Sequence, residues 1–303
     1  MMSAKPSIGF IGIGSMGWPM ASLILKAGFP VQVIDASAER GQAFVQEFGG
    51  SIAVSYKELA AAADIIITIL PTSAIVESIL TGPTGLLAGL KKDSVVVEMS
   101  SGVPTATRAL AALVEAAGGH LVDAPVSGGV PRAKTGELAI MFGGSAALLE
   151  RVRPVLSCMG TAITPTGGVG SAHAMKALNN LVSAGGFLIG IEALIIGQRF
   201  GLDPAAMVDV LNASTGMNNS TQKKFKQFVL SGKYNSGFGL DLMVKDLGIA
   251  LGIAKDTNTP VPFSSLCNEL CASSAAMLGP GQDHTAVAKL SEMLSGTKLS
   301  AAE

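Results

Sequence analysis

The chain has 303 residues, of which 49% are hydrophobic and only 14% charged, so it is long enough for two domains and has a large apolar surface to bury. Its formal net charge of −1 excludes nucleic acid and anionic membrane surfaces as expected partners and favours a small molecule. Three cysteines and three histidines form neither a disulfide framework nor a zinc-binding spacing, so we expect no metal.

An apolar segment near the start of the chain runs directly into three glycines. Residues Ile8–Ile13 have the composition of a buried parallel strand, and Gly12 near its end, with Gly14 and Gly17 after it, follows the spacing G-x-G-x-x-G. The first permits a tight turn, the second lets the backbone approach a pyrophosphate, and the third lets the next helix pack closely. The free amides at the start of that helix suit a phosphate. The residues expected to bind a dinucleotide here are Gly12, Gly14, Ser15, Met16 and Gly17.

A second predicted strand, Val31–Asp35, ends in a carboxylate about 20 residues past the glycines. At this place Asp35 is expected to bind the ribose 2′-hydroxyl of the adenosine half and to repel a 2′-phosphate. No basic residue stands at Ala36 or Ser37, so the sequence favours NAD over NADP. The alternative is that Asp35 caps the predicted helix from Ser37 to Glu47.

Strands and amphipathic helices alternate as far as Thr164, which is typical of a doubly wound α/β sheet. Because ligands of such sheets lie beyond the carboxyl ends of the strands, three loops are expected to line one crevice. These loops are Leu70–Thr72, Ser100–Gly102 and the segment from Ala124 onward. The predicted strands are Ile8–Ile13, Val31–Asp35, Ile52–Val54, Asp64–Leu70, Ser94–Met99, His120–Asp123, Leu138–Phe142 and Ala162–Thr164.

The pattern becomes entirely helical after Gly170. We therefore expect a dinucleotide-binding domain over residues 1–165 and a helical domain over 166–303, linked by a long helix at about 170–200. Part of this helix, Leu181–Gly197, is apolar enough to resemble a membrane span. Glu192 in its interior favours a helix buried among other helices instead. The start of the chain has no pattern of a secretory signal, so a cytoplasmic location is expected.

Two further segments carry groups suited to chemistry. The segment Asp123–Val130 has one hydroxyl and consecutive glycine amides, which suit a carboxylate, although a flexible turn would have the same composition. Lys176 and Asn180 lie four residues apart, hence on one face of the predicted long helix. On this pattern alone, the spacing favours a solvated surface charge for Lys176 over a catalytic role.

Four segments together resemble the signature regions of the β-hydroxyacid dehydrogenase family, which includes 3-hydroxyisobutyrate dehydrogenase and tartronate semialdehyde reductase. They are Gly9–Gly17, Asp123–Gly129, Gly167–Asn180 and Lys245–Leu247, in the same order along the chain. The resemblance implies a Rossmann-type domain, a long interdomain helix and a helical domain used for oligomerisation, as a dimer or a tetramer. It also implies NAD(P)-dependent oxidation of a short 3-hydroxy acid.

The resemblance also assigns roles to individual residues. Lys176 matches the family's catalytic lysine, and Asn180 matches its supporting asparagine. Lys245 matches the lysine near the nicotinamide. The segment that holds the substrate carboxylate is matched by Ser127, Gly128 and Gly129. The loops that contact the cofactor are matched by Leu70, Pro71 and Ser101.

These roles fit the chemistry of alcohol oxidation, in which a hydride leaves carbon while the hydroxyl proton passes to a base. A lysine can be that base if burial or a second cation, such as Lys245, lowers its pKa. The alternatives are an imine reductase, a class that usually lacks this lysine, and a non-catalytic dinucleotide-binding protein of the same fold. The polar segment Ser214–Thr221 either favours a hydroxylated substrate or caps a helix.

Overall fold

The computed structural model describes residues 5–300. They form two compact units that meet between Lys176 and Ala177. This junction lies inside helix α8 (Ser171–Phe200), which begins in the first unit and continues into the second.

The first unit contains a nine-stranded sheet in the order β3-β2-β1-β4-β5-β6-β8-β7, with β9 paired to β8. Strands β1 to β6 pair in parallel, whereas β8 runs antiparallel to β6 and β7. The expected doubly wound architecture is confirmed. One short strand, β7, was not predicted from the sequence. The strands are β1 (Ile8–Ile11), β2 (Val31–Ile34), β3 (Ser51–Ile52), β4 (Ile65–Thr68), β5 (Val95–Glu98), β6 (His120–Asp123), β7 (Val126–Ser127), β8 (Leu138–Gly143) and β9 (Gly160–Gly167).

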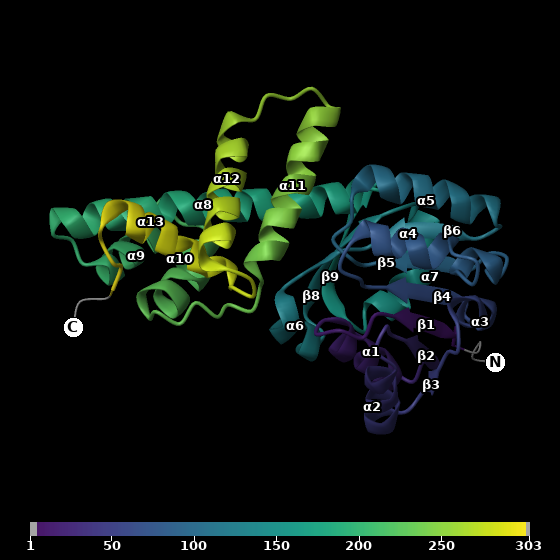
Figure 1. Cartoon of the computed structure of the whole chain (residues 1–303). Coiled ribbons are helices and arrows are strands. Elements are labelled where there is room, and N and C mark those ends of the chain that lie inside the picture. Colours follow the sequence, from purple (N-terminus) through teal and green to yellow (C-terminus); the bar gives the residue numbers. More distant parts are fainter. Residues whose placement is uncertain (1–4, 301–303) are drawn as a thin grey trace. The chain divides into compact units, whose positions relative to one another are not determined.

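Alternate residues of the central strands face two separate hydrophobic cores. On β4, Ile65 and Ile67 pack into one core, while Ile66 packs into the other. The first core includes side chains of α1 (Gly17–Lys26), α2 (Ala38–Phe48) and α7 (Ala146–Leu156). The second includes side chains of α3 (Tyr56–Ala62), α4 (Ser73–Thr81) and α5 (Pro104–Ala116). Both faces of the sheet are therefore covered, as the continuous apolar strands require (Figure 1).

The second unit is helical in its described part, apart from one isolated bridge between Gly239 and Asp283. Its core gathers apolar side chains from α8 and from the helices that follow. Within the polar segment Ser214–Thr221, Asn218 caps α10 by accepting hydrogen bonds from the amides of Ser220 and Thr221. After α8 come α9 (Pro204–Asn212), α10 (Asn219–Lys223), a π-helix (Phe225–Leu230), α11 (Leu240–Asp256), α12 (Pro262–Leu278), a 3₁₀ helix (His284–Val287) and α13 (Ala288–Ser295).

Among the described helices, α8 alone has the length and apolar composition to cross a membrane. Half of its most apolar window is buried inside the protein. Its side chains Phe187, Ile191 and Leu194 belong to the core of the second unit. This burial agrees with a helix packed among other helices, which is how a long apolar helix of a large protein is normally accommodated.

Candidate functional site

The glycine loop between β1 and α1 has a backbone conformation that requires glycine at two positions, Gly12 and Gly17. Gly12 has a φ of 90°, a left-handed conformation that side chains disfavour. A Cβ atom at Gly17 would overlap the carbonyl oxygen of Gly12, so this position admits only glycine. At Gly14, by contrast, an added Cβ would meet no heavy atom within 4 Å. The chain itself therefore does not require Gly14, which leaves space for a ligand to approach the backbone there.

The N-terminus of α1 is left without a side-chain cap. Its N-cap residue, Met16, forms no capping hydrogen bond, and its first turn holds no acidic residue. Helices α2, α3, α4 and α7 are capped by the hydroxyl groups of Ser37, Ser55, Thr72 and Ser145, whereas α5 and α6 (Gly129–Thr135) also lack a side-chain cap. Free amides and the positive end of the helix dipole suit a phosphate group. The loop and this helix end fit the pyrophosphate of a dinucleotide.

The end of β2 places Asp35 against the glycine loop. Oδ2 of Asp35 accepts a hydrogen bond from the amide of Ile13 at 2.8 Å, and Oδ1 accepts one from the amide of Ser37 at 3.0 Å. The helix cap at this place is Ser37, so the alternative role for Asp35 as the cap of α2 is wrong. Its carboxylate faces the glycine loop.

One basic residue at the glycine loop, Arg40, was not predicted from the sequence. Nε of Arg40 donates a hydrogen bond to the carbonyl oxygen of Ile13 at 2.5 Å, and its guanidinium lies 5.7 Å from the ring centre of Trp18. Arg40 and Asp35 therefore both hold Ile13 of the loop: Arg40 binds its carbonyl oxygen, and Asp35 binds its amide. The only available signal was that Arg40 lies within the first turn of α2, where it can reach back to the loop.

The loops after β4 and β5 are tied to each other. The amide of Leu70 donates a hydrogen bond to Oγ of Ser100 at 2.8 Å, and the amide of Val103 donates one to Oγ of Ser73 at 2.8 Å. These loops leave the carboxyl ends of neighbouring parallel strands, as expected. Pro71 and Ser101 lie in the same two loops. The buried hydroxyl of Ser100, which the sequence reading did not single out, makes the connection.

The segment Ser127–Gly129 joins β7 to the short helix α6 (Gly129–Thr135). Gly128 has a φ of 131° and Gly129 a φ of 66°, so both adopt backbone conformations that favour glycine. Helix α6 has no side-chain cap. The hydroxyl of Ser127 and the amides after it remain suited to a carboxylate. This segment and Lys176 belong to the same compact unit.

Lys176 and Asn180 occupy consecutive turns of α8, and both are buried, with 8% and 6% of their surfaces exposed. Nδ2 of Asn180 donates a hydrogen bond to Oδ2 of Asp246 at 2.6 Å, while the other oxygen of Asp246 lies 3.4 Å from Nζ of Lys245. The buried carboxylate of Asp246 therefore connects Asn180 with Lys245. Both are predicted site residues of the second unit, whereas the sequence reading gave no role to Asp246.

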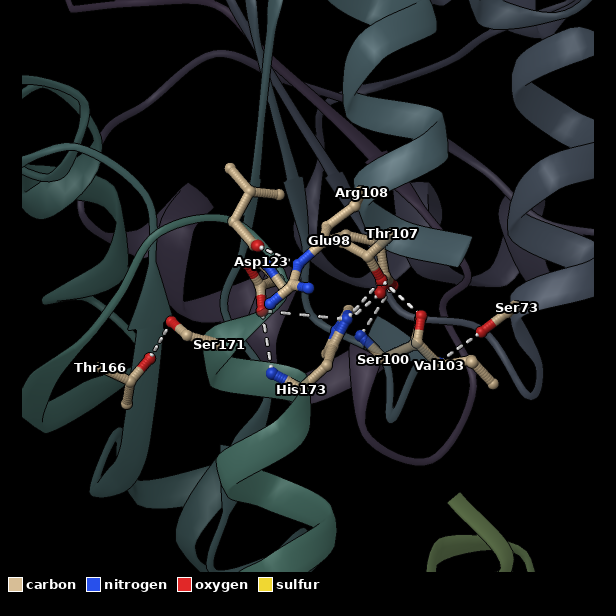
Figure 2. Close-up of polar contacts among 12 residues, drawn as sticks. Ser73, Glu98, Ser100, Val103, Thr107, Arg108, Asp123, Thr166, Ser171 and His173 are labelled. Atoms are coloured by element: carbon tan, nitrogen blue, oxygen red, sulfur yellow. Dashed lines mark hydrogen bonds and ion pairs between the residues drawn. The ribbon is translucent and has the colours of Figure 1, made fainter. Parts of the chain in front are cut away.

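The first turn of α8 is anchored to the sheet by Asp123, at the end of β6. Its two carboxylate oxygens accept hydrogen bonds from the amides of Gly170 and His173, at 2.7 and 2.8 Å. Figure 2 shows this carboxylate above the start of the helix. A negative charge at a helix N-terminus satisfies free amides and interacts favourably with the helix dipole. Asp123 thus fixes the start of the helix that carries Lys176.

A buried ion pair holds the same turn. Nε2 of His173 lies 2.8 Å from Oε2 of Glu98, and Nδ1 lies 2.8 Å from the hydroxyl of Thr107. That hydroxyl donates to the carbonyl oxygen of Val103, so it accepts a hydrogen bond from His173 (Figure 2). Burial disfavours the imidazolium, but the charges of Glu98 and Asp123 outweigh it and raise the pKa of His173. Burial likewise opposes ionisation of Glu98, yet His173 and Ser100 lower the pKa of its carboxyl.

Two protein-family models together match almost all of the chain. Residues 7–168 match the NAD binding domain of 6-phosphogluconate dehydrogenase. Residues 170–291 match the model described as NAD-binding of NADP-dependent 3-hydroxyisobutyrate dehydrogenase. The boundary between the two matches falls just before α8.

Individual proteins are similar over comparable lengths. The 2-(hydroxymethyl)glutarate dehydrogenase of Eubacterium barkeri is 38% identical over 299 residues, which cover 99% of both chains. The mitochondrial 3-hydroxyisobutyrate dehydrogenase of Mus musculus is 36% identical over 89% of this chain and 82% of its own. A solved structure of 3-hydroxyisobutyrate dehydrogenase from Mycobacterium tuberculosis with L-serine has a TM-score of 0.87 at 31% identity, and covers 94% of this chain and 99% of its own.

Proposed function

The chain belongs to the β-hydroxyacid dehydrogenase family, and on that premise we propose that it interconverts a short-chain 3-hydroxy carboxylic acid and its semialdehyde. Family membership makes the protein an oxidoreductase of hydroxy acids that uses a nicotinamide dinucleotide. The observation that carries the finer proposal is the burial of Lys176 and Asn180 on consecutive turns of α8. A buried amine next to a buried amide is an arrangement suited to proton transfer, because solvent does not compete for the substrate hydroxyl.

In this proposal Lys176 takes the hydroxyl proton of the substrate during oxidation and returns it during reduction. The bound nicotinamide supplies the hydride acceptor. Asn180 uses one N–H of its amide for Asp246, so its second N–H can hold the substrate oxygen in register with the lysine. Ser127, Gly128 and Gly129 bind the substrate carboxylate through a hydroxyl and backbone amides. Lys245, whose Nζ lies 3.4 Å from Asp246, is the residue that the family resemblance assigns to the nicotinamide.

A substrate screen tests the proposed reaction. The purified protein is incubated with 3-hydroxyisobutyrate, 2-(hydroxymethyl)glutarate, glycerate, threonate, serine and 4-hydroxybutyrate, each with NAD and with NADP, and NADH or NADPH formation is followed by absorbance. We expect oxidation of at least one 3-hydroxy acid. Reduction of cyclic imines without oxidation of any hydroxy acid would instead support the imine reductase alternative. Dinucleotide binding without any turnover would support a non-catalytic protein.

We propose NAD as the preferred cofactor because a carboxylate at the end of β2, held against the glycine loop, suits a ribose 2′-hydroxyl and repels a 2′-phosphate. Asp35→Asn keeps an oxygen that can accept the hydrogen bond from Ile13 but removes the charge. We expect the ratio of kcat/KM for NAD to kcat/KM for NADP to fall about tenfold or more, which corresponds to about 1.4 kcal/mol. Arg40, already at the glycine loop, would then attract the extra phosphate.

Steady-state kinetics with both cofactors measures this ratio. Glu47→Gln, which removes an exposed carboxylate from the far end of α2, is the matched control and should leave the ratio unchanged. An unchanged ratio in Asp35→Asn would contradict the role of this charge in cofactor choice. Adding Arg40→Ala to Asp35→Asn should reverse part of the gain in NADP use.

We also propose that the protein is a cytoplasmic homo-oligomer. Met175, Val182, Ile189 and Ile196 are exposed apolar residues at intervals of seven along α8, so they form one stripe on the helix. Apolar residues repeated every seven positions are typical of helices that pack against other helices. Light scattering, compared with the chain mass of 30.6 kDa, distinguishes a monomer from a dimer or a tetramer.

A further inference from the structure

A third polar side chain follows Lys176 and Asn180 along α8. Ser183 lies seven residues after Lys176, and at 100° per residue it points within about 20° of the direction of Lys176, roughly 10 Å further along the helix. Lys176, Asn180 and Ser183 therefore form one polar row on a helix that is otherwise mostly apolar. The first two members already have proposed roles toward the reacting end of the substrate.

The ammonium group of Lys224 lies at the far end of this row, next to Ser183. Nζ of Lys224, the residue after α10, donates a hydrogen bond to Oγ of Ser183 at 3.0 Å. It also lies 6.0 Å from the ring centre of Phe187, one turn further along α8. Asn218, the N-cap of α10, donates a hydrogen bond from Nδ2 to the carbonyl oxygen of Gly186 at 3.3 Å. Helix α10 is thus fastened to α8, which fixes the backbone from which Lys224 extends.

The described residues give the charge of Lys224 no anionic partner at close range. Among residues 5–300, no carboxylate lies within 4.0 Å of its Nζ. The facing titratable groups are Asp283 and His284. Asp283 already accepts hydrogen bonds from several groups, including Ser236 and Thr285, and its carboxylate raises the pKa of Lys224 only in part.

Burial lowers the pKa of Lys224 to about 8, so the amine is still mostly protonated at pH 7. Burial and the charge of Lys224 lower the pKa of His284 to about 4, so this imidazole is neutral at the same pH. A partly buried cation without a close counter-ion is unfavourable, and an anion bound beside it would remove that cost. The hydroxyl of Ser183 can donate a second hydrogen bond to such an anion.

We propose that Lys224 and Ser183 bind a second acid group of the substrate, so that the natural substrate is a dicarboxylic 3-hydroxy acid. This inference rests on the proposed function, in which Lys176 and Asn180 act on the hydroxyl end. The second carboxylate would lie along the polar row of α8, separated from the reacting carbon by a chain of a few bonds. Lys224 is then a residue that determines specificity, while the proton is transferred by Lys176.

Two acids that share the reacting centre provide the test. Both 3-hydroxyisobutyrate and 2-(hydroxymethyl)glutarate carry a hydroxymethyl group next to a carboxylate, but only the second has an arm that ends in another carboxylate. We expect the wild-type kcat/KM to be at least tenfold higher for the diacid. In Lys224→Met, the KM for the diacid should rise at least tenfold more than the KM for the monoacid. Lys224→Arg should retain most of the preference because it keeps the cation.

The matched control is Lys223→Met, which removes the exposed lysine next in the chain and should leave both KM values unchanged. Inhibition of the unaltered protein gives a second measurement that does not depend on the folding of a variant. Glutarate should compete with the hydroxy acid substrate at least tenfold more strongly than butyrate.

The outcomes separate this inference from the proposed function. If the wild-type protein prefers the monoacid, or if Lys224→Met changes both KM values equally, the second acid site is refuted while hydroxy acid oxidation stands. If no hydroxy acid is oxidised with either cofactor, the proposed function itself fails, and the inference fails with it.

Discussion

Replacing Lys176 with Ala is expected to lower kcat for hydroxy acid oxidation by a factor of about 10² to 10⁴, the usual contribution of a general acid–base group. The affinity for NADH should stay within about threefold of the wild-type value, because the proposed cofactor-binding residues, in the glycine loop and at Asp35, do not include this side chain. Steady-state kinetics measures kcat, and fluorescence titration measures the affinity for NADH.

Two further variants separate proton transfer from simple charge. Lys176→Arg keeps a positive charge, but a guanidinium stays protonated and cannot accept the hydroxyl proton, so it should be nearly as inactive as the alanine variant. Lys255→Ala removes an exposed lysine of α11 and should have no effect. A kcat in Lys176→Ala within tenfold of wild type would refute the role of Lys176 as general base.

The second large effect is expected from the buried ion pair at the start of α8. Replacing His173 with Ala should lower the free energy of unfolding by about 3–5 kcal/mol, because the Glu98 carboxylate would remain buried without its cation. Urea denaturation at pH 6, followed by circular dichroism, measures this loss. Lys91→Ala breaks the exposed ion pair with Asp64 and should cost less than about 1 kcal/mol.

The pH dependence of stability tests whether the pair of Glu98 and His173 is charged, and a double variant that removes both charges measures it. The pKa of His173 is raised in the folded protein, so its contribution to stability is complete below the ordinary value of 6.5 and is lost as the pH rises through the folded value. The pKa of Glu98 is lowered, so its contribution is complete above 4.5 and is lost as the pH falls through the folded value. The stability lost in the double variant Glu98→Gln/His173→Gln should therefore be largest between pH 4.5 and 6.5. A loss that is constant from pH 5 to pH 9 would argue against a charged pair.

The glycine loop shows how much of the cofactor site could be predicted from the sequence. Strand, glycine spacing and the carboxylate at Asp35 are features of one short stretch of chain, and the structure gives Gly12 and Gly17 the backbone roles expected of them. Arg40 was not predicted, because only Ala36 and Ser37, the residues directly after Asp35, were considered as possible partners of a 2′-phosphate. A helical residue one turn further along can reach back to the loop, and the sequence spacing alone did not indicate this.

The substrate side of the site was predicted less completely. The four-residue spacing of Lys176 and Asn180 was enough to place them on one helix face, and the family resemblance supplied their roles. The contact between Asn180 and Asp246 joins residues that lie 66 positions apart in the chain. Asp246 lies within the Lys-Asp-Leu segment, so the motif indicated that this segment matters but not that Asp246 binds Asn180.

By itself, the sequence determined the doubly wound sheet, the helical second half, the glycine loop and the order of the family motifs. These follow from local periodicity and from residue types at fixed spacings, because the strand and helix repeats decide which side chains share a face. Only the tertiary structure decided which charged groups have partners. Glu98 meets His173, Asp123 caps α8, and Lys224 reaches Ser183 with no carboxylate of the described residues within 4.0 Å. Such pairings depend on how distant segments pack, and the cost of burying an unpaired charge is decided only once that packing is known.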